Sequence, residues 1–347
     1  MDVNFLNGPH HELALHAACA KGLYDAVELL IENGSLLDTK DSLGHTPLTN
    51  AIFARSLPCI ELLINYNGSP ADVSVIDDQG NNLLHLAATN NFASAIPLLI
   101  KKGVPIDSHN QRWLSPLAVA ISFGCLDAAN ALIEGGADVN GRTRFATVLH
   151  HAVTWNRLEV VKKLIELNCN VNVVNILEET PLYLAVQQRK IDIVRYLIEE
   201  GKADPCFTVN NLPNTSNLPL LYAANHGYTE ICRLLITQNT STFFIQTSAN
   251  MSRRAGYPLT EEFLNNILAE RQQITAAAAA AITIDPPIEN NVDLNDRIVY
   301  DNGNKDNTNN VNNSNSVEEN NKDDNDDNKE AVAAFESIFN TFSDDEL

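Results

Sequence analysis

Apolar residues in the first two-thirds of the chain recur in short blocks with the spacing of α-helices. In each block an alanine follows a leucine by 3 residues, and a Leu-Ile pair begins 15 residues after that leucine. The leucines are Leu15, Leu48, Leu84, Leu117, Leu149, Leu182 and Leu220. The alanines are Ala18, Ala51, Ala87, Ala120, Ala152, Ala185 and Ala223. Because no block can bury an apolar face alone, the pattern predicts stacked helix pairs.

Seven units follow from this alignment, with successive leucines 32 to 38 residues apart. In unit four, Pro116 fits the first turn of a helix, and Gly136 fits a helix end because glycine tolerates positive φ. We therefore expect each unit to contain two antiparallel helices joined by a tight turn, with an extended loop to the next unit. Pro97 falls inside the expected second helix of unit three, where it should remove a hydrogen bond and kink the helix.

The pattern resembles the ankyrin repeat over about residues 8–240. The residues that carry the resemblance are His45-Thr46-Pro47-Leu48, Leu84-His85-Leu86-Ala87-Ala88, Ser115-Pro116-Leu117, Leu149-His150, Thr180-Pro181-Leu182 and Gly135-Gly136-Ala137-Asp138-Val139-Asn140. The resemblance implies an all-α repeat solenoid of seven helix-turn-helix units with β-hairpin fingers, which binds a partner protein along a concave face. It also implies that His16, His85 and His150 brace neighbouring fingers and do not catalyse a reaction.

Composition divides the chain into four regions. We expect residues 1–240 to form the ankyrin repeat domain and residues 241–283 to form a C-terminal helical cap over the last apolar face. Residues 284–328 are rich in Asn and Asp, and we expect a disordered linker. Residues 329–347 form a short amphipathic segment, which we interpret as a second binding motif. Its apolar positions share one helical face and are Phe335, Ile338, Phe339 and Phe342.

Charge and hydropathy restrict the partners. The formal net charge is −21, and the acidic tail at residues 284–347 holds 17 acidic and 4 basic residues. Such a chain repels phosphate backbones, which argues against nucleic acid as a partner. No apolar run could span a bilayer, and the first residues show no signal-peptide pattern. We therefore expect a cytoplasmic protein that binds another protein and not a membrane.

The sequence holds no Gly-rich phosphate loop, no His-Glu-x-x-His pair and no Cys-x-x-Cys pair. It therefore predicts a scaffold or adaptor with no catalytic residue, no cofactor, no metal site and no small-molecule substrate. One alternative is a bacterial effector acting in the host cytoplasm, because the Asn-rich acidic C-terminus is similar to the translocation signals of type IV-secreted ankyrin effectors. A second alternative is an enzyme with a site in the capping region.

Units four and five carry aromatic residues in two columns that are polar or small in most other units. One column lies in the fingers, where an arginine precedes each aromatic residue, and the other lies 6 residues after the motif leucine. Trp and Arg are enriched at interface hot spots. We therefore predict that a partner binds there; the alternative is that these rings pack inside the array. The predicted binding residues are Arg112, Trp113, Phe123, Arg144, Phe145 and Trp155.

Overall fold

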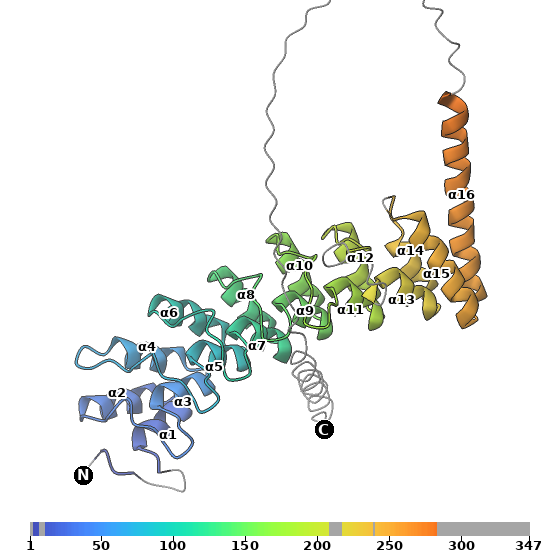
Figure 1. Ribbon diagram of the computed structural model, residues 1–347. Helices are drawn as coiled ribbons and strands as arrows, with labels where there is room; N and C mark the ends of the chain where they lie inside the picture. Colours follow the sequence, from blue (N-terminus) through green and yellow to red (C-terminus); the bar gives the residue numbers. More distant parts are fainter. Residues whose placement is uncertain (1–2, 7–10, 208–216, 239, 283–347) are drawn as a thin grey trace, which may run out of the picture. The chain divides into compact units, whose positions relative to one another are not determined.

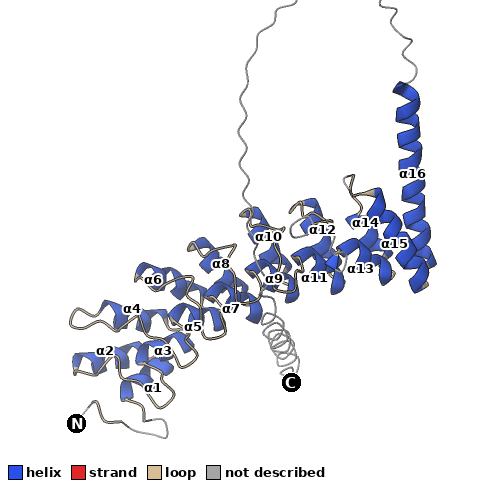
Figure 2. Ribbon diagram, in the orientation of Figure 1, coloured by secondary structure: helices blue, strands red, loops and turns tan. Residues whose placement is uncertain are grey.

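The computed structural model describes residues 3–6, 11–207, 217–238 and 240–282, with the backbone alone in 278–282. These residues form stacked pairs of short helices (Figures 1 and 2). The opening helices of the seven units are α1 (Ala14–Ala20), α3 (Pro47–Phe53), α5 (Leu83–Thr89), α7 (Pro116–Phe123), α9 (Val148–Thr154), α11 (Pro181–Gln187) and α13 (Pro219–Asn225). The closing helices are α2 (Tyr24–Glu32), α4 (Leu57–Asn65), α6 (Ile96–Lys101), α8 (Leu126–Glu134), α10 (Leu158–Glu166), α12 (Ile191–Glu199) and α14 (Thr229–Leu235). The predicted seven-unit solenoid is confirmed.

Capping residues determine where several opening helices begin. Thr46, Ser115 and Thr180 are the N-caps of α3, α7 and α11, and each hydroxyl accepts a backbone N–H three residues on at 3.0–3.3 Å. A proline follows each cap, at a position where its missing N–H costs nothing. The motif leucine that comes next is 1% exposed in all three helices. The cap therefore sets the rotation of the helix that buries this leucine.

The repeated spacing of alanines places a small side chain where successive units meet. Each opening helix packs against the opening helix of the next unit, from α1 against α3 to α11 against α13. The alanines at this position in units two to seven are all 0% exposed. Because a methyl group occupies so little space, the two helices can approach closely, and a larger side chain would have nowhere to go.

The prediction for Pro97 was wrong. The closing part of unit three begins with a short 3-10 helix, η1 (Ala93–Ala95), and α6 starts only at Ile96. Pro97 therefore lies in the first turn of α6, where no intrahelical hydrogen bond needs its N–H. The helix is shortened at its start and is not kinked in its middle.

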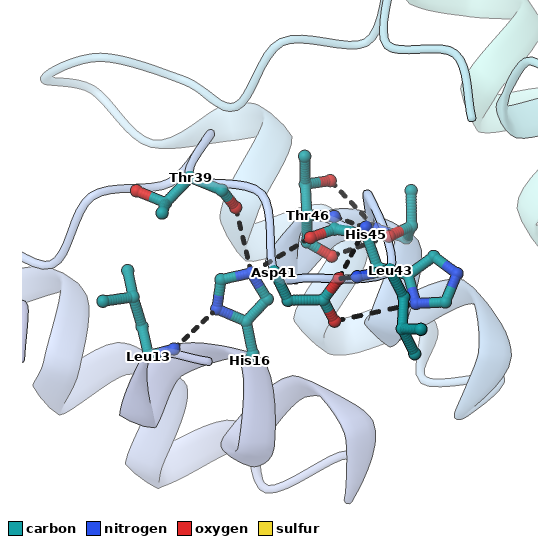
Figure 3. A network of polar contacts seen from close by, with 8 residues as sticks. Leu13, His16, Thr39, Asp41, Leu43, His45 and Thr46 are labelled. Atoms are coloured by element: carbon teal, nitrogen blue, oxygen red, sulfur yellow. Dashed lines mark hydrogen bonds and ion pairs between the residues drawn. The ribbon is translucent and has the colours of Figure 1, made fainter. Parts of the chain in front are cut away.

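Buried histidines connect the opening helices to the fingers of the next unit, and Figure 3 shows this for His16. The Leu13 N–H donates to His16 Nδ1 at 3.1 Å, so the proton is on Nε2 and is donated to Thr39 O at 2.9 Å. His85 and His150 repeat this arrangement, with Nε2–H donated to Leu114 O and Glu179 O at 2.9 and 3.0 Å. The predicted bracing role of the three histidines agrees with this geometry.

The fingers are tight turns stabilised by side chains, and not paired strands. In the finger before α3, Asp41 Oδ1 accepts the N–H groups of Leu43 and His45 at 2.9 and 2.8 Å (Figure 3). Asp77, Asn110 and Asn175 repeat this turn in later fingers. The described part of the chain contains isolated β-bridges and no strand; two of these bridges lie in fingers and pair Ile76 with Asn82 and Arg142 with Thr147.

Two further helices follow unit seven, α15 (Thr242–Ala255) and α16 (Pro258–Ile282). α15 packs against α13 as an opening helix of an eighth unit would. Ser252 Oγ donates to Ala224 O at 3.0 Å, and Leu264 of α16 is 0% exposed. Both helices lie within residues 241–283, for which the cap stays a prediction. The predicted linker and terminal segment, residues 284–347, lie outside the described residues.

Stability should depend on the alanine positions. Ala120→Leu adds three carbon atoms to a 0% exposed site between α7 and its neighbours, so we expect the free energy of unfolding to fall by about 1–3 kcal/mol. Ala20→Leu, at an exposed position of α1, is the matched control and should change it by less than about 0.5 kcal/mol. Thermal melts followed by circular dichroism compare them; equal melting temperatures would contradict this packing.

The histidine brace should make stability depend on pH. Burial lowers the pKa of His150 from its usual 6.5 to about 4, so the folded protein keeps it neutral where the unfolded chain takes up a proton. Stability from this group is complete above pH 6.5 and falls as the pH approaches 4, with a loss of about 2 kcal/mol at pH 5. In urea unfolding, His150→Thr should lower the free energy of unfolding at pH 8 and should reduce the loss of that free energy between pH 8 and pH 5. The control His11→Thr, at an exposed position, should have neither effect. A His150→Thr chain with the parent's pH dependence would refute the assignment.

Candidate functional site

The finger before α7 carries Arg112 and Trp113 on a turn that is held from several sides. Asn110 Oδ1 accepts the N–H groups of Arg112 and Leu114 at 3.0 and 3.1 Å. His85 of the preceding unit donates to Leu114 O at 2.9 Å, as described above. The previous finger adds Gln79 O, which accepts the Gln111 N–H at 2.9 Å. The backbone of this fingertip is therefore fixed while its side chains remain exposed.

Trp113 stands where two other fingers have glycine. Its φ is 58°, and the corresponding Gly44 and Gly80 have φ of 79° and 76°. A bulky residue in the left-handed region is uncommon and costs about 1–3 kcal/mol. The indole is nevertheless 55% exposed, with the His109 ring 6.1 Å away between centroids. Trp113 therefore combines a left-handed backbone with an exposed aromatic ring.

The finger before α9 is built differently. Arg142 occupies the place of the Asp or Asn that organises other fingers, and Thr143 takes over its role. The Thr143 N–H donates to Ala146 O at 2.7 Å, and Thr143 Oγ1 accepts the Ala146 N–H at 3.1 Å. At its tip the Arg144 guanidinium lies over the Phe145 ring, 5.3 Å from the centroid. This finger thus presents a stacked cation and aromatic ring.

Hydrogen bonds join the two fingers to each other and to the next finger. His109 Nε2 contacts Arg142 O at 2.8 Å, and the Ile176 N–H donates to Phe145 O at 3.0 Å. The opening helices behind the fingers, α7 and α9, pack side by side. Arg112–Trp113 and Arg144–Phe145 therefore form one row, which we call the finger row.

The other two predicted aromatics form a second row at the helix ends. Phe123 is the last residue of α7 and is 51% exposed, and Trp155 is the half-buried C-cap of α9. Arg157 Nε donates to Ile121 O at 3.3 Å and so binds the C-terminus of α7. Gly124 has φ of 74°, and a Cβ there would lie 2.5 Å from an Arg157 nitrogen. Glycine therefore lets this arginine reach the helix end.

The six predicted residues thus lie in two rows. α7 has 8 residues, so its ends are about 12 Å apart. The structure brings Arg144 and Phe145 into contact and places Arg112 and Trp113 in the adjacent finger, with Phe123 and Trp155 at the opposite ends of the same helices. A partner that touches both rows must span at least the length of α7.

Charge distinguishes this region from other exposed apolar positions, such as Leu29 at 60% exposure. The segments 109–125 and 141–157 contain four arginines and no Asp or Glu, in a chain with net charge −21. The arginines are Arg112, Arg142, Arg144 and Arg157. Exposed Asp78 in the finger before this region and exposed Glu178 in the finger after it limit the basic stretch to two units.

Sequence reasoning missed an aromatic cluster in units six and seven. Tyr222 stacks on His226 with centroids 4.0 Å apart, and Tyr183 meets Tyr222 edge-on at 5.5 Å. The Arg189 guanidinium lies 4.8 Å from the centre of the Tyr228 ring. A signal was present, because His226 falls in the same column as the two helix-end aromatics. The longer spacing before unit seven made that column less visible.

The other chemical groups are placed as follows. The terminal-motif residues Phe335, Ile338, Phe339 and Phe342 lie outside the described residues, so that motif stays a prediction.

All six cysteines are free thiols. Among the side chains that the structure describes, no group of three His, Cys, Asp or Glu could hold a metal ion. No helix in the described residues combines the length and apolar character needed to cross a bilayer.

Comparisons with known proteins support the repeat assignment. A family model for ankyrin repeats in three copies matches residues 1–74, 66–143, 84–175 and 149–246. The B-cell lymphoma 3 protein homolog of Mus musculus is 30% identical over 184 residues, 52% of this chain and 41% of that protein. Inversin of Canis lupus familiaris is 30% identical over 239 residues, 67% of this chain and 22% of that protein. The chain thus spans less than half of either relative.

The same similarity appears in three dimensions. The crystal structure of the ankyrin repeat domain of Bcl-3, a member of the IkappaB protein family, matches with a TM-score of 0.56 at 25% sequence identity. The match covers 65% of this chain and 99% of that chain. The similarity therefore covers the stacked repeats.

Replacing Trp113 should distinguish the cost of its left-handed backbone from any contribution of its ring to stability. In Trp113→Gly the left-handed backbone is no longer strained, so we expect a free energy of unfolding at least equal to the parent's and about 1 kcal/mol above that of Trp113→Ala. Glu178→Gly, at the same place in another finger with φ of 59°, is the matched control and should behave alike. Urea unfolding measures all four chains; a Gly variant less stable than the Ala variant would show that the ring supports the fold.

Proposed function

Because the chain belongs to the ankyrin repeat family, we propose that it is a non-enzymatic scaffold or adaptor that binds a partner protein through the finger row and helix ends of units four and five. The family supports the general role, since ankyrin repeats are protein-interaction modules. The position of the site on the array is our own assignment.

Exposed aromatic residues beside arginines carry this proposal. Trp113 and Phe123 are 55% and 51% exposed, so burial in the array does not account for them. Phe145 and Trp155 are half-buried, which fixes their orientation while leaving part of each ring accessible. Partly buried aromatics and arginines on a rigid support are typical of interface hot spots, because little side-chain entropy is lost on binding.

The bonding of the histidines supports a non-catalytic role. His16, His85 and His150 use both ring nitrogens in bonds that hold the array, and burial lowers the pKa of His85 and His150. A histidine bonded at both nitrogens has no nitrogen left to transfer a proton to a substrate. The three bracing histidines are thus structural.

Capture of a partner by the full chain tests the proposal. Trp113→Ala and Trp155→Ala should each weaken binding about thirtyfold, the cost of a 2 kcal/mol hot spot, and should keep the array folded. Phe243→Ala, which removes a 65% exposed ring on α15, is the control and should retain the partner. Affinity is measured by titration after mass-spectrometric identification of the captured protein. Full binding by both Trp variants would place the partner elsewhere on the array.

A further inference from the structure

Arginine and aromatic side chains alternate along the finger row, with one pair in each of two adjacent units. The pairs are Arg112 with Trp113 and Arg144 with Phe145. We propose that the finger row binds an acidic, extended peptide segment of the partner, in which a carboxylate and an apolar side chain recur every third residue. This inference rests on the proposed function and names the chemistry of its partner.

The spacing of the units sets the spacing in the peptide. Packed helices such as α7 and α9 lie about 8–10 Å apart, so successive Arg–aromatic pairs should repeat at that distance. A polyproline II peptide has three residues per turn and rises 3.1 Å per residue, so it presents every third side chain on one side about 9 Å apart. One peptide turn therefore matches one unit of the array.

Charge selects a carboxylate as the ligand group. Planar guanidinium groups bind carboxylates through paired, charge-assisted hydrogen bonds, and the neighbouring rings offer apolar contact. Arg142 and Arg157 donate to the backbone carbonyls of Val174 and Ile121, and their charges add to the positive charge of the segments 109–125 and 141–157. No acidic side chain belongs to either of the segments 109–125 and 141–157.

The limits of the basic stretch favour a short peptide over single-stranded nucleic acid. A nucleic-acid groove follows the phosphate backbone over many nucleotides. Here exposed Asp78 and exposed Glu178 lie in the fingers on either side, and they would repel phosphates that continue beyond units four and five. A peptide with only a few consecutive carboxylates fits between them.

The two tryptophans of the chain provide a direct test. Trp113 lies in the finger row and Trp155 in the helix-end row, so Trp155→Phe and Trp113→Phe chains each report on one row. The probe is the peptide Asp-Leu-Pro repeated four times, added to the full chain. We expect it to change the emission of Trp113 in the Trp155→Phe chain and to protect it from iodide, while the emission of Trp155 in the Trp113→Phe chain stays constant.

Charge variants and control peptides complete the experiment. Arg112→Glu with Arg144→Glu should weaken peptide binding at least about tenfold, whereas Arg195→Glu on the outer helix α12 should not. Arg112→Gln with Arg144→Gln gives the same comparison without added negative charge, and circular dichroism melts confirm that each variant is folded. Higher salt should weaken binding, and the Lys-Leu-Pro analogue should fail to bind.

Three results would overturn the proposal. One is a Trp113 emission that the acidic peptide leaves unchanged; another is equal binding when the Asp-Leu pairs are five residues apart. The third is binding of an oligothymidylate to the same row in competition with the peptide, which would assign the row to single-stranded nucleic acid. Failure of the acidic peptide while Trp113→Ala still loses the captured partner would reject this ligand chemistry and leave the proposed function intact.

Discussion

Everything in this protein depends on burial that is shared between units. A helix pair of this length cannot cover its own apolar face, so each unit contributes half of two interfaces. The alanine at each of these interfaces is 0% exposed from unit two to unit seven, which leaves no room for variation there. Because stacking uses only this side of each helix, fingertips and helix ends are free to differ without loss of the fold.

Hydrogen bonds from the stacked helices hold the fingers in place. A histidine in one unit holds a carbonyl in the next finger, and an Asp or Asn within that finger closes the turn. The finger before α9 has neither element, because Ala118 stands at the histidine position and Arg142 at the Asp position. Hydrogen bonds of Thr143 and of the neighbouring His109 hold this turn instead, and Arg144 and Phe145 lie at its tip.

The period of the repeat was predictable from sequence, and most contacts between units were not. Leucine, alanine and glycine positions recur in register, so the seven helix pairs could be predicted, and the resemblance to the ankyrin repeat implied the histidine braces. The start of α6 could not be predicted, because Pro97 is compatible either with a kink inside a longer helix or with a helix that begins later. The contact between Arg189 and Tyr228 joins residues of different units, and only the stacked geometry brings them together.

The candidate site shows the same division. The residue types and columns of the site were visible in the sequence. The separation into two rows follows from the length of α7. The left-handed backbone of Trp113 follows from a turn in which two other fingers have glycine. Such strain persists only where the surroundings determine the backbone completely. Asn110, His85 and Gln79 do so from three different segments. Shared burial thus stabilises the stack, the stack fixes the finger, and the finger can hold an exposed tryptophan in a conformation that an isolated loop would not keep.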